Sequence, residues 1–106
     1  MHLFDINIPG KITYKESSTF TAGNQICVVD TEYCKIGIGI CYDLRFSEQA
    51  LLMAKEGAQV LIYPGSFNLT TGPLHYELLL RSRALDNLCY VIGACVARFT
   101  GDPNIY

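Results

Sequence analysis

The chain has 106 residues, half of them hydrophobic and 17% charged, and its formal net charge is −2. Because so short a chain normally carries proportionally more polar surface, this composition predicts part of a larger fold or a subunit of an oligomer. The absence of any lysine and arginine cluster argues against nucleic-acid binding. No apolar run approaches the roughly 20 residues that cross a bilayer, and the N-terminus lacks the basic and apolar regions of a signal peptide, so no membrane association is expected.

The first half of the chain predicts an irregular start followed by two strands and a helix. Residues 1–25 are punctuated by proline, glycine and serine and show little periodicity. Residues 26–29 and 33–40 are predicted strands, which the polar turn at residues 30–32 joins. Residues 47–56 predict an amphipathic helix that ends at a glycine. The residues along its buried face would be Phe46, Ala50, Leu51, Met53, Ala54 and Gly57.

The second half predicts a strand, a loop, a longer helix and a last strand. Residues 59–63 form a short apolar run typical of a buried strand, which the following Pro-Gly pair would end. A loop of small polar residues is predicted at 66–73, and a helix at about 74–88 that ends near Asn87. Residues 90–97 are the last predicted strand. The inner stripe of the longer helix would consist of Leu74, Leu78, Ser82 and Leu85.

The predicted order β-β-α-β-α-β is typical of an α/β fold built in layers. The corner after the second strand would lie at the carboxyl edge of the sheet, where ligands bind in such folds. A loop is predicted at residues 101–104. Glu77 and Arg81, one helical turn apart, are expected to form an ion pair.

The five cysteines do not follow the spacing of a known framework. Their number is odd and no C-x-x-C pair occurs, so neither disulfides nor a metal site is predicted, and no cofactor is expected. Free thiols fit a reducing compartment, which predicts a cytoplasmic or mitochondrial protein. Four of them lie in or beside apolar strands, where free cysteine behaves as a small buried hydrophobe: Cys27, Cys34, Cys89 and Cys95.

The fifth cysteine, Cys41, lies at the corner between a predicted buried strand and a helix, within residues 37–46 (GIGICYDLRF). Such a corner can hold one side chain at the open edge of the sheet, beside the free N–H groups of the helix start. The helix start and Arg45 would favour a thiolate, and the N–H of Tyr42 would help to bind an oxyanion. The corner therefore predicts a cysteine nucleophile for acyl transfer; a buried structural thiol is the alternative interpretation.

The residue that would act as the base is left open by these patterns. His75 could form a Cys–His pair with the nucleophile, or it could be a polar residue at a helix start. Asp43 and Arg45 could pair and hold the corner in place. Phe67 and Asn68 follow the end of a strand, where residues that contact ligands often lie. Three carboxylates near apolar surroundings are further candidates for the base, although most glutamates simply face water: Glu16, Glu48 and Glu77.

Several segments, in order, resemble the nitrilase (carbon-nitrogen hydrolase) superfamily. Residues 37–46 closely resemble its nucleophile segment, and residues 61–73 (LIYPGSFNLTTGP) and 75–87 (HYELLLRSRALDN) continue the similarity. Residues 2–6 (HLFDI) and 9–13 (PGKIT) are similar to the omega-amidase branch of that superfamily. The resemblance covers essentially the whole chain.

The resemblance implies an α-β-β-α sandwich, of which residues 1–106 would be a partial domain, a middle segment that is incomplete at both ends. It also implies a Glu–Lys–Cys triad, in which Cys41 matches the nucleophile and Glu16 matches an additional glutamate that supports the triad. The catalytic lysine would directly precede Met1 and the base glutamate would lie further upstream, so both would be outside this chain. The implied reaction is hydrolysis of the terminal amide of α-ketoglutaramate or α-ketosuccinamate.

Three hypotheses follow. The first is an omega-amidase-type hydrolase whose isolated segment is inactive. The second is a non-catalytic fragment that associates with full-length relatives, which the apolar composition favours. The third is a self-sufficient Cys–His hydrolase that uses His75. The expected partners are a small ω-amide substrate and, in the full-length protein, a second copy in a dimer, with no nucleic acid and no membrane.

Overall fold

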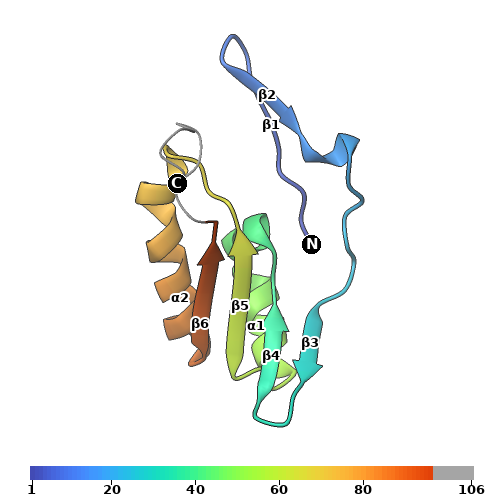
Figure 1. Ribbon diagram of the computed structural model, residues 1–106, viewed down its shortest axis with the longest axis vertical. Coiled ribbons are helices and arrows are strands. Elements are labelled where there is room, and N and C mark those ends of the chain that lie inside the picture. Colours follow the sequence, from blue (N-terminus) through green and yellow to red (C-terminus); the bar gives the residue numbers. More distant parts are fainter. Residues whose placement is uncertain (97–106) are drawn as a thin grey trace.

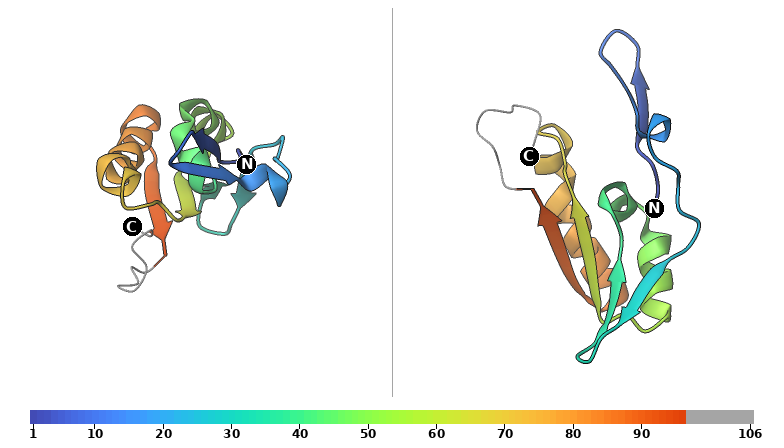
Figure 2. Two further views of the ribbon diagram at one scale, coloured as in Figure 1. Left: turned by 90° about the horizontal axis from the view of Figure 1, so that it is seen from above. Right: turned by 45° about the vertical axis from the view of Figure 1, so that its right-hand side comes forward.

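The computed structural model describes residues 1–96, which form two β-sheets and two α-helices (Figure 1). The first sheet is a hairpin of β1 (Asp5–Ile8) and β2 (Ile12–Lys15). The second sheet has four strands in the order β3 (Cys27–Asp30), β4 (Lys35–Ile38), β5 (Val60–Gly65) and β6 (Tyr90–Cys95). Helices α1 (Ser47–Lys55) and α2 (Glu77–Asn87) cover one face of this second sheet (Figure 2). The predicted α/β class is confirmed.

The core lies between the four-stranded sheet and its two helices. Strands β4, β5 and β6 run parallel, and each helix connects two of them, whereas β3 and β4 form an antiparallel hairpin. The predicted helix over residues 47–56 is confirmed, and Gly57, at φ 91°, ends it. Leu51, expected on the buried face, is exposed. The buried hydrophobic residues are Leu44, Ala50, Met53, Ala58, Leu61, Tyr63 and Phe67.

The strand boundaries differ from the predictions at several places. The turn between β3 and β4 spans residues 31–34 instead of 30–32, and Thr31 Oγ1 donates a hydrogen bond to Cys34 O (2.7 Å) within it. Strand β4 is shorter than the predicted 33–40 at both ends. Strand β5 does not end before Pro64 but continues through Gly65, which lies opposite Cys95 of β6. The proline is tolerated because the pairing of β4 with β5 has already ended at Ile62. Residue 97 and the loop predicted at 101–104 lie outside the described residues.

The N-terminal 25 residues are not irregular, so that prediction is wrong. They contain the β1–β2 hairpin, in which Asp5 lies opposite Lys15 and Ile8 opposite Ile12. Gly10, at φ 74°, lies in its turn. Nearly all side chains of both strands are exposed, so no buried face imposes the alternation by which strands are recognised. Figure 1 shows the hairpin projecting past the carboxyl edge of the four-stranded sheet, to which it connects through residues 19–26.

The longer predicted helix exists, but its buried stripe was placed on the wrong face. A π-helical turn at Gly72–Tyr76 precedes α2, and Leu88, at φ 52°, follows it, so the end near Asn87 is confirmed. The leucines that pack toward the core are Leu79 and Leu80, so the sequence offers leucines on two faces of this helix. Three of the four expected inner residues are in fact exposed: Leu74 (64%), Leu78 (63%) and Leu85 (75%). Arg83, which was not expected inside, is buried.

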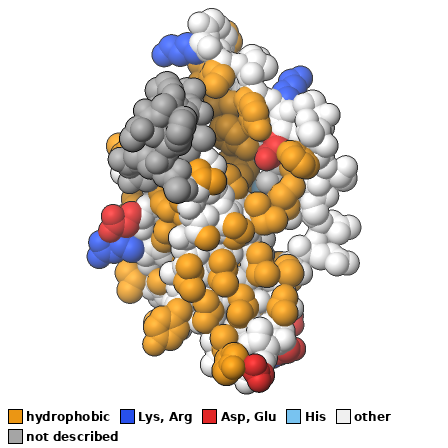
Figure 3. Space-filling model, viewed as in Figure 1, with side chains coloured by type: hydrophobic (Ala, Val, Ile, Leu, Met, Phe, Trp, Pro, Cys, Tyr) orange, Lys and Arg blue, Asp and Glu red, His pale blue; other side chains and the backbone are white. Residues whose placement is uncertain are grey.

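The face of the four-stranded sheet that points away from the helices is apolar. Figure 3 shows hydrophobic side chains gathered over the strands, and Val29 and Ile92 are among the exposed ones. Cys27 is also exposed, which corrects its predicted burial, because its neighbour Val28 is the residue that packs toward the core. A sheet that is apolar on both faces is typical of an internal layer. In the described residues, neither helix is long and apolar enough to cross a membrane.

Candidate active site

Cys41 lies at a sharp turn between a strand and a helix, as the sequence predicts. Strand β4 ends at Ile38, and a 3₁₀-helix, η2 (Cys41–Arg45), begins at the cysteine, before α1. The backbone of Cys41 has φ 47°, a left-handed conformation that costs free energy in a residue with a β-carbon. Such conformations persist only where the surroundings hold them in place, and they cluster at active sites. The turn is therefore held by contacts that the fold supplies.

One of these contacts comes from Gly65, at the end of β5. A β-carbon there would lie 2.7 Å from Cys41 Cα and 3.2 Å from its Sγ, so only glycine lets the two segments approach this closely. The thiol of Cys41 donates a hydrogen bond to the carbonyl oxygen of Ser66 (3.6 Å). The sequence showed the Pro-Gly pair but no sign that its glycine lies against Cys41.

Asp43 fixes the start of the 3₁₀-helix. Its side chain is buried, and its Oδ2 accepts a hydrogen bond from the Ile40 N–H (2.8 Å). Its Oδ1 accepts two more, from the backbone N–H of His2 (2.6 Å) and from His2 Nδ1 (2.7 Å). Burial favours the neutral acid, but these hydrogen bonds outweigh it and lower the pKa of Asp43 below its ordinary value. The expected Asp43–Arg45 pair is therefore wrong, because His2 is the partner of Asp43.

Arg83, from α2, holds the end of the same 3₁₀-helix. Its Nε donates to the carbonyl oxygen of Leu44 (3.1 Å) and its Nη2 to that of Arg45 (3.5 Å). The guanidinium is buried, and Nη1 lies 3.4 Å from the carboxylate of Asp86. The sequence analysis did not identify this residue as buried. It lies among other charged residues of the same helix, and nothing in the local sequence distinguishes it from the exposed ones.

Arg45 itself turns toward Phe67 and His75. Its guanidinium carbon lies 5.3 Å from the centre of the Phe67 ring, a cation–π contact. Its Nη1 lies 3.3 Å from His75 Nδ1, and because arginine only donates, the Nδ1 of His75 accepts. His75 thus supports Arg45 and pairs with the guanidinium, whereas the thiol of Cys41 pairs with Ser66. This arrangement does not supply the Cys–His pair of the third hypothesis.

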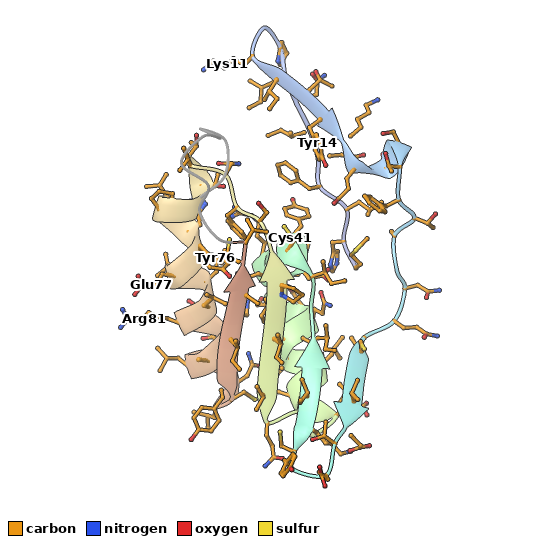
Figure 4. The ribbon with its side chains drawn as sticks, viewed as in Figure 1. Lys11, Tyr14, Cys41, Tyr76, Glu77 and Arg81 are labelled. Carbon is orange, nitrogen blue, oxygen red and sulfur yellow. The ribbon has the colours of Figure 1, made fainter. Side chains whose placement is uncertain are left out.

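A pocket of about 560 Å³ opens above Cys41, between the hairpin and the edge of the four-stranded sheet. Six of the predicted site residues line it: Glu16, Cys41, Tyr42, Arg45, Phe67 and Asn68. Phe4, Ile12, Tyr14, Ser66 and Thr71 complete the lining; of these, Figure 4 labels Tyr14, on the hairpin side of Cys41. Asp43 and His75 are absent from the lining. Asp43 contacts the backbone at Ile40, and His75 contacts the lining residue Arg45.

Glu16, the residue directly after β2, lines this pocket. Its Oε2 accepts a hydrogen bond from the Phe4 N–H (2.7 Å), which orients the side chain. The side-chain oxygen of Asn68 accepts hydrogen bonds from the N–H groups of Thr70 (3.0 Å) and Thr71 (2.8 Å), so it shapes its own loop while its residue lines the pocket. The sequence named both residues, but only the fold brings the Glu16 side chain and Cys41 into one pocket.

A sequence profile of the carbon-nitrogen hydrolases matches residues 1–102. The chain belongs to this family. The human and Xenopus tropicalis proteins named omega-amidase NIT2 are each 58% identical to the chain over 98 residues, which are 92% of this chain and 36% of each relative. The chain thus spans about a third of the length of these relatives.

Solved structures of the same superfamily match the fold of this carbon-nitrogen hydrolase chain. Saccharomyces cerevisiae Nit3, a member of branch 10 of the nitrilase superfamily, is 49% identical, with a TM-score of 0.80 over 85% of this chain and 33% of its own. The Caenorhabditis elegans NitFhit protein is 48% identical, with a TM-score of 0.82 over 90% of this chain and 23% of its own. The resemblance noted in the sequence is therefore confirmed.

Two other carboxylates proposed for this carbon-nitrogen hydrolase site lie elsewhere. Glu48 lines a separate cavity of about 520 Å³ beside His2 and Gln49. Glu77 pairs with Arg81 (3.6 Å), which confirms the predicted ion pair, and Figure 4 shows both on the outer side of α2. Lys11 does not stand in for the lysine that the resemblance implies, because it lies at the far tip of the hairpin, away from Cys41 (Figure 4). Within residues 1–96, no group of three or more histidine, cysteine or acidic side chains could hold a metal ion.

Proposed function

We propose that Cys41 is the nucleophile of an omega-amidase-type hydrolase that acts on small ω-amides such as α-ketoglutaramate and α-ketosuccinamate. The observation that carries this proposal is the left-handed turn at Cys41, held beside Glu16 in one pocket. The thiol gives up its proton and the thiolate attacks the amide carbon; the carbon–nitrogen bond breaks, and the nitrogen takes up that proton and leaves as ammonia. Water then hydrolyses the thioester, which frees the carboxylic acid and restores the thiol.

Each of several lining residues would contact a different part of the substrate. The N–H of Tyr42, directly after the nucleophile, would donate to the oxyanion that forms on the amide carbon. Arg45 is a cation in the lining, and a guanidinium matches the carboxylate at the other end of a keto-acid substrate. Phe67 holds that guanidinium in place, and Asn68 also lines the pocket. Glu16 would orient the leaving nitrogen.

The resemblance requires a lysine and a base glutamate that the 106 residues do not supply, so we propose that this polypeptide alone turns over substrate at a negligible rate. Losing a member of a catalytic triad costs several orders of magnitude in rate. We also propose that the full-length protein is a dimer, binds neither nucleic acid nor membranes, and acts in the cytoplasm or mitochondria, where its free thiols stay reduced.

The purified chain tests the proposal with chloroacetamide, an amide that alkylates thiols. We expect Cys41 to be labelled faster than the exposed Cys27 of the same molecule, and the carboxylate-bearing competitor α-ketoglutarate to slow labelling of Cys41 alone. Peptide mass spectrometry separates the two sites. Equal rates at both cysteines, or no competition, would contradict a substrate site at Cys41. Ammonia release from α-ketoglutaramate, compared with a Cys41→Ala control, tests the expected lack of turnover.

The second candidate function is association with full-length relatives without catalysis. It is favoured by the leucines that α2 and its ends leave exposed, among them Leu78 (63%) and Leu88 (93%). Size-exclusion chromatography of the chain alone and mixed with an intact homologue measures this directly. A Leu78→Glu variant should abolish any co-elution, whereas a chain that stays monomeric in the presence of the homologue would exclude the association.

A further inference from the structure

His2 connects the N-terminal segment to the nucleophile turn. Its backbone N–H and its ring Nδ1 both donate to Oδ1 of Asp43, at 2.6 and 2.7 Å, although the two residues are 41 positions apart in the sequence. Because an ionised carboxylate only accepts, Nδ1 carries the proton in this hydrogen bond. The ring also stacks on Phe46, with centroids 3.6 Å apart and planes 9° from parallel. The ring is therefore fixed by both a hydrogen bond and a stacking contact.

Asp43 also binds the backbone of Ile40, the residue before Cys41. Its other oxygen, Oδ2, accepts from the Ile40 N–H at 2.8 Å, and its own N–H donates to Ile40 O at 2.9 Å. The turn at Ile40 leads directly into Cys41, whose φ of 47° is unfavourable unless neighbouring groups hold it. One carboxylate thus joins the ring of His2 to the backbone that aims the thiol.

We propose that His2 is a positioning residue for Cys41, acting through Asp43 on the turn at Ile40. His2 lines a separate cavity together with Phe46 and is absent from the lining of the Cys41 pocket, so it does not serve as the base or touch the substrate. Without the ring donor, Oδ1 keeps only the backbone N–H of His2, and the carboxylate gains freedom to rotate away from Ile40. The benefit to catalysis rests on the function proposed above; the mechanical link does not.

Two variants separate the hydrogen bond from the stacking contact. His2→Phe keeps a flat ring against Phe46 and removes the donor, whereas His2→Asn removes the ring and places an amide N–H near the position of Nδ1. Hydrogen exchange of the Ile40 amide reports directly on its bond to Asp43. We expect His2→Phe to speed this exchange by about 10-fold, as the loss of a hydrogen bond to a charged group would, and His2→Asn to stay within about 2-fold of the wild type.

The labelling of Cys41 by chloroacetamide, taken relative to Cys27, is the second readout. It should fall by about 5-fold in His2→Phe and recover in His2→Asn, because the released turn leaves its strained conformation. A purely structural role for the ring predicts the opposite order, in which His2→Phe behaves like the wild type; that result, or equal effects of both variants, overturns the proposal. If the wild type labels Cys41 no faster than Cys27 while exchange follows the expected order, the proposed function fails and the positioning role stands.

Should His2→Phe not fold, the wild-type ring decides the question. Two-dimensional ¹H–¹⁵N spectra of the histidine side chains reveal which ring nitrogen carries a proton. The proposal requires a protonated Nδ1 on His2 that shifts in an Asp43→Asn variant. A neutral ring with its proton only on Nε2 would rule it out.

Discussion

The pocket has two walls that are built in different ways. The wall that carries Cys41 continues into a 3₁₀-helix whose Asp43 and Leu44 are completely or almost completely buried. The opposite wall is the β1–β2 hairpin, whose pocket-lining residues Ile12 and Tyr14 are 53% and 50% exposed. The first wall is held by residues from three other parts of the chain. At the base of the second wall, the ring of Phe4, just before β1, lies 5.2 Å from that of Tyr42.

Under the function proposed above, the two walls would divide the work: one would carry the thiol and the other would contact the substrate. An attacking thiol needs a fixed direction, which buried hydrogen bonds and close packing provide. A wall with few buried contacts opens at low free-energy cost, and such segments are the ones that move when ligands bind. The four predictions below test this difference, beginning with the largest expected effect.

Replacing the carboxylate of Asp43, in the wall that carries Cys41, should lower the stability of the fold more than any other change proposed here. In Asp43→Asn, an amide NH₂ faces one of the three donors, so we expect a loss of about 3 kcal/mol in the free energy of unfolding, measured by urea titration. Because the pKa of Asp43 is lowered in the folded state, its contribution is complete above its ordinary pKa and is lost as the pH falls through the lowered value. The difference between wild type and variant should therefore shrink below about pH 4.

Asp5 of the hairpin is the matched control. It accepts hydrogen bonds from the N–H (3.0 Å) and the hydroxyl (2.6 Å) of Ser17, but it is exposed. Asp5→Asn should leave the urea midpoint nearly unchanged. Equal losses from the two substitutions would show that the two walls are equally rigid.

Removing the buried arginine should come next. Arg83→Met fills a similar volume but leaves the carbonyl oxygens of Leu44 and Arg45 without their donor, so we expect a loss of about 2 kcal/mol. Arg81→Met, two positions earlier on α2, removes only an exposed ion pair with Glu77 and should cost less than about 0.5 kcal/mol. Thermal unfolding followed by circular dichroism measures both, and a reversed order would contradict the role assigned to Arg83.

The close approach of β5 to Cys41 predicts a smaller loss of stability with a larger loss of thiol reactivity. In Gly65→Ala the new methyl group meets the backbone of Cys41, which should cost about 1.5 kcal/mol and slow chloroacetamide labelling of Cys41. Gly10→Ala is the control in the hairpin. Its φ of 74° is strained for alanine but no atom lies within 4 Å of the added carbon, so Cys41 should react as in the wild type.

Trimming the open wall should hardly affect stability. Tyr14→Ala is expected to change the free energy of unfolding by less than about 0.5 kcal/mol, because half of this side chain is already in water. It should nevertheless weaken the competition of α-ketoglutarate with labelling at Cys41, measured as a higher half-maximal concentration. A large loss of stability without a change in competition would assign the hairpin to the core of the fold instead.

The parts of the fold that the sequence predicted are those with a strong local period. The helix over residues 47–56 repeats its apolar residues at helical spacing, and the parallel strands are short apolar runs between turns. The hairpin was missed because both its faces are exposed. The stripe of α2 was misplaced because this helix carries leucines on two faces: Leu79 and Leu80 pack toward the core, whereas Leu78 and Leu85 are exposed.

The sequence by itself determined the corner at Cys41, where a strand ends shortly before the cysteine and a helix begins at it, and the family resemblance that goes with it. Only the tertiary structure decided what holds and surrounds it, namely that Asp43 pairs with His2 and not with Arg45, that Arg83 is buried, and that Glu16 shares a pocket with Cys41. The physical reason is that local conformation depends on neighbours within a few residues. The partners of buried polar groups come instead from segments that meet only when the chain has folded.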